Sequence, residues 1–300
     1  MNILITGGSG LIGQHLISSL IQTKNHITVL TRDSVKSARK LPIGVNLIES
    51  LSQKNVDNHE VIINLAGEPI AEKRWSKTQK QKICHSRWHI TTQLVELIKN
   101  ANTPPKVFIS GSAIGMYGRQ DHKKIDENFT DFHQEFTHDV CSSWEEIALE
   151  ATSTTTRVAV IRTGIVLDPN GGALAKMLLP FKLGIGGKIA SGQQFMSWIH
   201  IEDMVAAILH IMKTQTLSGA INITSEHAVS NQEFSKTLAR TLNRPSVFTT
   251  PSFMLKALFG EMADLLLFGQ NVIPQKLVNT GFTFKYPTLD ATLNNLIKQQ

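Results

Sequence analysis

Apolar residues along this 300-residue chain alternate between two spacings, and the alternation predicts the order of strands and helices. Short, β-branched apolar runs typical of buried strands occur at 2–6, 26–32, 61–67, 106–113 and 156–167. Apolar positions at helical spacing begin at Leu11 and recur over 75–101 and 136–152. Strands that alternate with helices predict an α/β fold with a doubly wound parallel sheet, whose ligands gather at the C-terminal ends of the strands.

Glycines crowd the turn between the first strand and the first helix, in the stretch GGSGLIG. Gly7, Gly10 and Gly13 are spaced three apart, so the chain turns tightly at the first and a phosphate approaches bare backbone at the second. The third lets the helix pack close to the sheet, and the helix start offers N–H groups and a positive dipole end to an anion. The stretch predicts a bound dinucleotide; a glycine turn without a ligand is the alternative.

The end of the second strand decides between the two nicotinamide cofactors. There the chain reads VLTRD, with Thr31 and Arg32 at the strand end and Asp33 next. An arginine at this place accommodates the 2′-phosphate of NADP, whereas an acidic residue binds the ribose 2′-hydroxyl of NAD. Arg32 therefore favours NADP(H), and Asp33 leaves NAD as an alternative cofactor. The alternative role for Arg32 is that of a surface residue without a ligand.

The pattern loosens after Asp168 into a segment with several turn signals. We therefore expect a Rossmann domain at 1–167, with contributions from about 198–225, and a smaller C-terminal α/β substrate or lid region at 168–300. Within the second region, WIHIEDM predicts a helix that begins near Glu202 and Asp203.

Composition narrows the class of protein. Hydrophobic residues make up 41% of the chain, which is ample for a core, and no basic leader or apolar run of membrane-spanning length is visible. We therefore expect a cytoplasmic protein without a membrane partner, acting as a monomer or homodimer. Cys84 and Cys141 are far apart, and the histidines show no ligand spacing, so we predict no metal.

The chain is basic, with a formal charge of +6 and a pI of about 9.3. This balance suits an anionic ligand such as NADP, or nucleic acid. The densest basic stretch, at 72–82, places its lysines on one helical face without interleaved aromatic residues, which is typical of a solvated surface. We therefore predict no nucleic-acid partner.

Several stretches together resemble the extended short-chain dehydrogenase/reductase superfamily, the group that includes nucleotide-sugar epimerases and dehydratases. They are GGSGLIG, NLAGEPI and SGSAIGMYG. Further stretches look like an atypical epimerase-family subgroup that carries a small C-terminal domain of unknown role. These are GEPIAEKRW, SRWHIT, VCSSWEEIA, RTGIVLD, FMSWIHIEDM and a tail over about 250–297.

The resemblance implies roles for individual residues. It implies that the pyrophosphate lies against Gly7, Gly10, Leu11, Ile12 and Gly13, and that Arg32 holds the 2′-phosphate. The adenosine and its ribose would be bordered by Leu65, Ala66 and Gly67, and we place Thr31 and Glu68 with the cofactor-binding residues as well. Ser112 stands where the superfamily places a residue that hydrogen-bonds the substrate carbonyl or hydroxyl; its alternative role is a turn residue or helix cap.

One departure from the superfamily is serious. Its members use a tyrosine with a lysine four residues later, because the lysine lowers the tyrosine pKa for proton exchange during hydride transfer. The only tyrosines here are Tyr117 and Tyr286, and neither has such a lysine. Cys141 and Glu145 occupy the two expected positions. We keep three replacements open: Tyr117, Glu145 or Glu146 as a base, and Cys141 as a nucleophile.

Two arginines and a histidine complete the candidates. Arg87 and Arg162 are each suited to pairing with a carboxylate or phosphate, and a structural ion pair is the alternative for both. We place Arg87 with the cofactor-binding residues because its helix is expected to face the cofactor cleft. His200 is expected to be a packed histidine rather than a proton donor.

These observations predict an NADP(H)-dependent atypical reductase, epimerase or dehydratase that acts on a small polar molecule, including the nucleotide-sugar class. Ser112 and Tyr117 are the predicted catalytic residues, with Ser112 orienting the substrate and Tyr117 donating the proton. The alternative is a non-catalytic NADP-binding redox sensor or regulatory protein, which the missing tyrosine–lysine pair favours.

Overall fold

The computed structural model describes residues 1–120 and 122–298 and is built on a seven-stranded sheet in which every strand pair is parallel. In order across the sheet, the strands are β12 (Gly219–Ile223), β7 (Arg157–Thr163), β5 (Val107–Ala113), β4 (Val61–Asn64), β1 (Asn2–Thr6), β2 (His26–Leu30) and β3 (Asn46–Ile48). The chain winds outward from β1 to β3, then returns to β4 on the other side of β1. The predicted doubly wound sheet is confirmed, and its switch point lies between β1 and β4.

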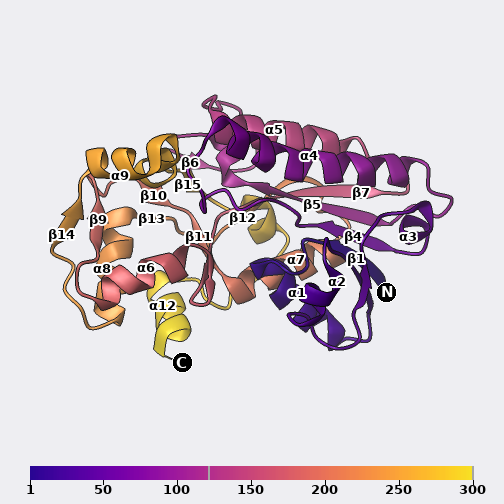
Figure 1. Ribbon diagram of the computed structural model, residues 1–300, viewed down its shortest axis with the longest axis horizontal. Coiled ribbons are helices and arrows are strands. Elements are labelled where there is room, and N and C mark those ends of the chain that lie inside the picture. The colour runs from indigo at the N-terminus through magenta and orange to yellow at the C-terminus, as the bar shows by residue number, and fades with distance from the viewer. Residues whose placement is uncertain (121, 299–300) are drawn as a thin grey trace.

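Helices cover both faces of the sheet, and Figure 1 shows the two layers. One face carries α1 (Leu11–Ile21) and α7 (Ile201–Lys213), and the other carries α3 (Gln53–Asp57), α4 (Lys77–Lys99) and α5 (Phe136–Leu149). Alternate residues of each strand enter opposite cores: Ile3 and Ile5 pack with α1 and α7, whereas Leu4 packs with α4. Both faces of β1 are therefore buried, which explains its continuous apolar sequence.

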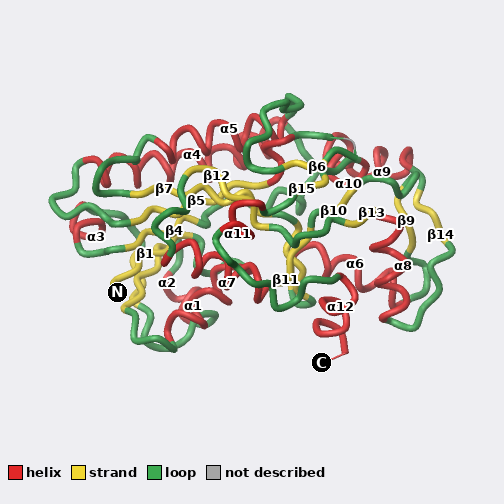
Figure 2. The backbone as a smooth tube through the Cα atoms, turned by 180° about the vertical axis from the view of Figure 1, so that it is seen from behind, coloured by secondary structure: helices red, strands yellow, loops and turns green. Residues whose placement is uncertain are grey.

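The C-terminal part lies at the end of the sheet remote from the N-terminus (Figures 1 and 2). Its helices are α6 (Gly172–Lys182), α8 (Asn231–Thr241), α9 (Ser252–Phe259), η2 (Gly260–Ala263), α10 (Asp264–Leu267) and α12 (Leu289–Lys298). Short strands pair beside them: β9 (Gly187–Ile189) with β14 (Phe248–Thr250), and β10 (Phe195–Met196) with β13 (Val229–Ser230). A second buried cluster, which includes Trp198, Phe234 and Leu293, forms the core of this part.

The strand predicted at 156–167 is broken, which corrects the sequence interpretation. After β7 the chain leaves the sheet at Gly164, and β8 (Ile165–Asp168) pairs instead with β11 (Trp198–His200). A β carbon at Gly164 would lie 2.5 Å from the carbonyl oxygen of Ser197, so only glycine allows the two segments to approach this closely. The helix predicted to begin near Glu202 is α7, which starts at Ile201 directly after β11.

Residues 250–298 pack against both parts of the molecule. Leu277 of α11 (Gln275–Asn279) is buried in the same cluster as the sheet residues, while Leu293 of α12 belongs to the C-terminal core. The strand β15 (Asn271–Val272) pairs with β6 (Lys124–Ile125), which precedes α5 in the chain. The predicted division at 167/168 stays a prediction, and residues 299–300 of its second region lie outside the described residues.

Candidate functional site

The glycine turn lies at the switch point, between the ends of β1 and β4. Gly7 has a φ of +70°, and a β carbon there would lie 2.5 Å from the carbonyl carbon of Leu65. A β carbon at Gly13 would lie 2.5 Å from the carbonyl oxygen of Gly7, so the helix passes directly over the turn. Gly10 is the N-cap residue before α1 and offers no side-chain cap, which leaves the first-turn N–H groups of Leu11 and Ile12 open to a ligand.

The residues after β2 occupy distinct environments. The Asp33 carboxylate accepts a hydrogen bond from the backbone N–H of Lys36 at 2.8 Å and so caps α2 (Ser34–Ala38). The Thr31 hydroxyl lies 2.6 Å from that of Ser37. Arg32 is exposed and forms no ion pair with any described residue. The acidic side chain is thus engaged by its own helix, whereas the guanidinium remains available.

The loop after β4 is tied to α4. The backbone N–H of Glu68 donates to the Ser86 hydroxyl at 2.8 Å, and the Glu68 carbonyl accepts from Arg87 at 3.0 Å. Leu65 and Ala66 are half-buried and border the glycine turn through the close approach of Leu65 to Gly7. The structure therefore brings Leu65, Ala66, Gly67, Glu68 and Arg87 together at the same sheet edge as the glycines.

Ser112 stands at the end of β5, on the face covered by α5. Its hydroxyl donates to Oε1 of Glu145 at 2.6 Å. The same carboxylate receives two parallel hydrogen bonds from Arg162, from Nε to Oε1 and from Nη2 to Oε2, each 2.8 Å. All three side chains are buried. Burial by itself would lower the pKa of Arg162, but Glu145 outweighs it and raises that pKa, so Arg162 stays charged.

Tyr117 extends this buried network away from Ser112. Its side chain is 0% exposed, and its hydroxyl donates to Oδ1 of Asn222 at 2.7 Å and accepts from Nη1 of Arg162 at 3.0 Å. Burial raises the pKa of Tyr117 against the opposing effect of Arg162, so the phenol remains protonated at neutral pH. The predicted catalytic pair is thus joined through Arg162 and Glu145, with Ser112 at one end and Tyr117 at the other.

Cys141 is next to this network, one helical turn before Glu145. It is 4% exposed, and burial together with the nearby Glu145 charge raises the pKa of Cys141 to about 11. A thiol with this pKa is almost entirely protonated near neutrality. This environment favours the packing role for Cys141 over the nucleophile that the sequence left open.

Two other candidates have structural partners. Arg162 is engaged by Glu145, which is the ion-pair alternative stated for it. His200 stacks on Tyr286 with ring centroids 3.8 Å apart, and its Nδ1 accepts from the backbone N–H of Glu202 at the start of α7. Burial lowers the pKa of His200. The expectation of a packed histidine is confirmed.

Sequence reasoning missed two asparagines that organise the site. Oδ1 of Asn64 accepts from the Thr6 hydroxyl at 2.6 Å, and its Nδ2 donates to the Thr91 hydroxyl at 2.8 Å, which joins β1, β4 and α4. Asn222, from β12, holds Tyr117 across the sheet end. A polar residue that ends the apolar run VIIN was a signal for Asn64, whereas Asn222 lies 105 residues from Tyr117 and gave none.

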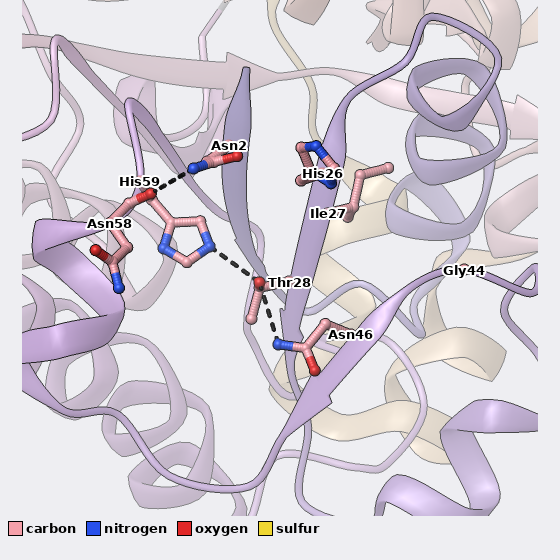
Figure 3. A pocket seen from close by; sticks show the side chains of 8 residues that line it. All are labelled: Asn2, His26, Ile27, Thr28, Gly44, Asn46, Asn58 and His59. Carbon is pink, nitrogen blue, oxygen red and sulfur yellow. Dashed lines mark hydrogen bonds between the residues drawn. The ribbon is translucent and has the colours of Figure 1, made fainter.

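A separate pocket of about 280 Å³ lies at the opposite edge of the sheet. Figure 3 shows its lining around the first residues of β1, β2 and β3, with His59 bonded to Thr28. Because ligands of doubly wound sheets bind at the carboxyl ends of the strands, this pocket is not the candidate site.

Across residues 1–120 and 122–298, no group of three or more His, Cys, Asp or Glu is arranged to hold a metal ion. Over the same residues, no helix has both the length and the apolar character to cross a membrane.

A glycine turn and an open helix start at the switch point of a parallel sheet are typical of dinucleotide-binding proteins. Comparison with family models agrees with this class. Residues 3–224 match the NAD dependent epimerase/dehydratase family, and residues 250–296 match a domain of unknown function, DUF1731. The chain belongs to the NAD dependent epimerase/dehydratase family.

Individual relatives support this assignment. An epimerase family protein of Staphylococcus saprophyticus is 38% identical over 294 residues, which cover 98% of each chain. The crystal structure of the human epimerase family protein SDR39U1 (isoform 2) with NADPH has a TM-score of 0.90 and 31% identity, with 100% of each chain covered. A nucleoside-diphosphate sugar epimerase from Corynebacterium glutamicum has a TM-score of 0.79 and 27% identity, covering 99% of this chain and 58% of the other.

Proposed function

We propose that this protein is an NADP(H)-dependent oxidoreductase or epimerase that acts on a small polar substrate. The family assignment and the NADPH in the human relative's structure support the cofactor class. The glycine turn fits this cofactor because side chains at Gly7 or Gly13 would collide with neighbouring backbone where a pyrophosphate needs bare peptide. When bound, the nicotinamide supplies or accepts a hydride.

Arg32 is the residue we assign to the 2′-phosphate of the cofactor. Its guanidinium is exposed at the end of β2, while the neighbouring Asp33 carboxylate is held by the Lys36 N–H. An acidic side chain that caps its own helix competes poorly for a ribose hydroxyl, and a free arginine suits a phosphate. This division of roles supports NADP(H) over NAD(H).

The hydrogen bond between Ser112 and Glu145 carries the proposal of catalysis. In this proposal Oγ of Ser112 contacts the reacting oxygen of the substrate, and its own proton moves to Oε1 of Glu145 as it accepts the substrate hydroxyl proton. The reverse transfers protonate a substrate carbonyl oxygen. Arg162 holds the carboxylate in place through its two hydrogen bonds. This pair replaces the absent tyrosine and lysine.

Tyr117 takes a positioning role here, in place of the proton donor expected from the sequence. Its hydroxyl is hydrogen-bonded to Asn222 and Arg162 inside the protein, so it acts on Glu145 only through Arg162. The Tyr117→Phe variant should therefore lower kcat modestly and leave its pH profile in place, whereas loss of Glu145 should change that profile.

Calorimetric titration with NADPH and with NADH tests the proposal first. We expect NADPH to bind with a Kd of about 1–10 μM, and NADH or the Arg32→Ala variant to bind at least about tenfold more weakly. An Arg240→Ala variant, which changes an exposed arginine paired with Asp290 on α12, is the matched control. Absence of NADPH binding would refute the enzyme proposal. Binding without turnover of any carbonyl compound or nucleotide sugar would favour the redox sensor instead.

A further inference from the structure

The positive charge of this chain is concentrated in two segments of its C-terminal part. Residues 169–201 and 234–260 together hold seven lysines and arginines and no aspartate or glutamate, whereas the whole chain has a net charge of +6. Six of the seven form no ion pair with any residue that the structure describes: Lys176, Lys182, Lys188, Lys236, Arg244 and Lys256. Charge of one sign without counterions attracts an anionic partner.

Two of these lysines line a hollow of about 170 Å³ between α8 and β14. Lys188 comes from β9, and Lys236 lies one helical turn after Gln232 on α8. The other lining residues are Ser246, Val247, Phe248 and Thr249, so the lining contains no acidic side chain. Two ammonium groups in a hollow of this size suit one phosphate group.

Exposed apolar side chains lie beside the hollow. Val247 belongs to its lining and is 77% exposed. Leu183 and Ile185 are also exposed. They flank Gly184, where a β carbon would lie 3.9 Å from the Pro245 ring, so their segment runs next to the residues that precede β14. A group of large apolar side chains that faces water marks a contact surface.

The helix α9 extends this apolar surface at the same end of the molecule (Figures 1 and 2). It begins directly after Pro251, and Leu255 is its only buried residue. Its outward side chains are mainly apolar, with Phe253 75% and Leu258 62% exposed, and Lys256 lies between them in sequence. An apolar helix face that is turned outward beside a lysine is typical of helices that lie in a membrane interface.

We propose that the end of the molecule formed by α9, β14 and the connection from α6 to β9 binds an anionic lipid surface, in place of the sequence expectation of no membrane partner. Lys188 and Lys236 hold a lipid phosphate, and Phe253 and Leu258 enter the boundary between headgroups and acyl chains. A lipid surface of this kind is negative throughout, which matches charge of one sign. A second copy of this chain would instead bring the same lysines together. The contact needs no membrane-spanning helix, and it does not depend on the proposed function.

Vesicle co-sedimentation tests the inference. The full chain is mixed with vesicles of phosphatidylcholine alone, or of phosphatidylcholine and phosphatidylglycerol in equal parts. We expect the anionic vesicles to bind the protein about tenfold or more tightly than the neutral vesicles at about 0.1 M salt. Binding should weaken at about 0.5 M salt, because the attraction between lysines and lipid phosphates is screened.

A charge-reversed variant tests the lysines of the hollow. Lys188→Glu combined with Lys236→Glu should weaken binding to the anionic vesicles by about tenfold or more. The matched control is Lys24→Glu combined with Lys54→Glu, which reverses two exposed lysines outside the two basic segments and should bind nearly as wild type. The NADPH Kd of both variants should stay within about twofold of wild type, which shows that the fold is intact.

A second set of variants tests the apolar face of α9. Phe253→Ser combined with Leu258→Ser should also weaken binding to the anionic vesicles by about tenfold or more, whereas Ile43→Ser, at a fully exposed position in the N-terminal part, should not. Insertion is measured separately with vesicles whose acyl chains are brominated. These should quench the added tryptophan of Phe253→Trp, and they should leave that of Ile43→Trp unquenched.

Several outcomes would overturn the inference. Absence of binding to anionic vesicles, equal binding to both kinds of vesicle, or unchanged binding in either double variant would each do so. Binding of soluble polyglutamate as tightly as the anionic vesicles, unaffected by the serine substitutions, would replace the lipid with an acidic polypeptide. A dimer in sedimentation velocity that dissociates in Phe253→Ser combined with Leu258→Ser would assign the surface to a second copy of this chain.

Discussion

The hydroxyl of Ser112 and the carboxylate of Glu145 lie 2.6 Å apart in a buried site, 33 residues apart in sequence. In the superfamily that this chain resembles, the position of Glu145 is held by a lysine, which would repel Arg162. Here the carboxylate attracts that arginine, with 2.8 Å between Nη2 and Oε2. The side chain at position 145 is thus negative where the superfamily has a positive one, and Arg162 balances its charge. The loss of the tyrosine–lysine pair is therefore accompanied by a new buried ion pair.

Ser112→Ala should lower kcat by about 10²–10⁴-fold with little change in the NADPH Kd, because it removes the proposed proton path without touching the glycine turn. Steady-state kinetics with an identified substrate, alongside cofactor titration, provide the measurement. Ser142→Ala is the control, since this residue also donates to a glutamate, Glu146, but on the exposed side of α5. Wild-type kcat in Ser112→Ala would contradict the assignment.

Breaking the buried pair should destabilise the protein strongly. Glu145→Gln or Arg162→Met leaves one buried partner without its counterpart, and we expect a loss of about 3–5 kcal/mol in the free energy of unfolding. Changing both together should cost less than the sum of the two. Lys285→Ala, which breaks an exposed pair with Glu202, should leave the free energy of unfolding nearly unchanged. Denaturant unfolding measures all four variants.

Gly7→Ala should impair both stability and NADPH binding. The substitution combines a φ of +70° with a β carbon 2.5 Å from the Leu65 backbone, and we expect a loss of more than about 2 kcal/mol. Gly281→Ala isolates the conformational part, because Gly281 has a φ of +76° with no atom within 4 Å of its β position. That control should lose about 1 kcal/mol and keep normal NADPH affinity. Similar losses in the two variants would refute the crowding argument.

The raised pKa of the Cys141 thiol predicts how the stability of the protein depends on pH. Its pKa is raised from 9.0 in the unfolded chain to about 11 in the fold, so the folded state holds this proton more tightly. Its contribution to stability is complete below pH 9 and is lost as pH rises toward 11, by up to about 2 kcal/mol. Between pH 8 and pH 10.5, denaturant unfolding should show a larger fall in the free energy of unfolding for the wild type than for Cys141→Ala. Iodoacetamide should modify folded Cys141 slowly at pH 7, and the alanine variant should keep its activity.

Much of the architecture follows from the sequence because local pattern and fold agree. The glycine spacing and the run of Asn2–Thr6 fix the turn at the switch point, and the apolar runs locate five of the sheet strands. The break at Gly164 was missed, since the apolar pattern continues through it and only contact with Ser197 shows why the chain turns away. Periodicity reports burial, but it does not report which neighbour a strand joins.

The site was harder to derive because its key relationships are between distant residues. Glu145 and Arg162 were each recognised as unusual, but nothing in the sequence indicated that they form one pair. Tyr117 was favoured as a proton donor by its place near Ser112, whereas its hydroxyl is directed to Asn222 on the edge strand β12. The role of a buried polar or charged side chain depends on its hydrogen-bond and ion-pair partners. Those partners are distant in sequence, so only the tertiary structure identifies them.

The packing of residues 250–298 has a consequence for the smallest part of this protein that can fold. Leu277 and Leu293 enter different cores, and β15 pairs with β6. A truncation before residue 250 would expose apolar surface in both cores at once. We therefore expect the segment matched by a domain model of unknown function to belong to the minimal folding unit of this protein and not to fold as a separate module.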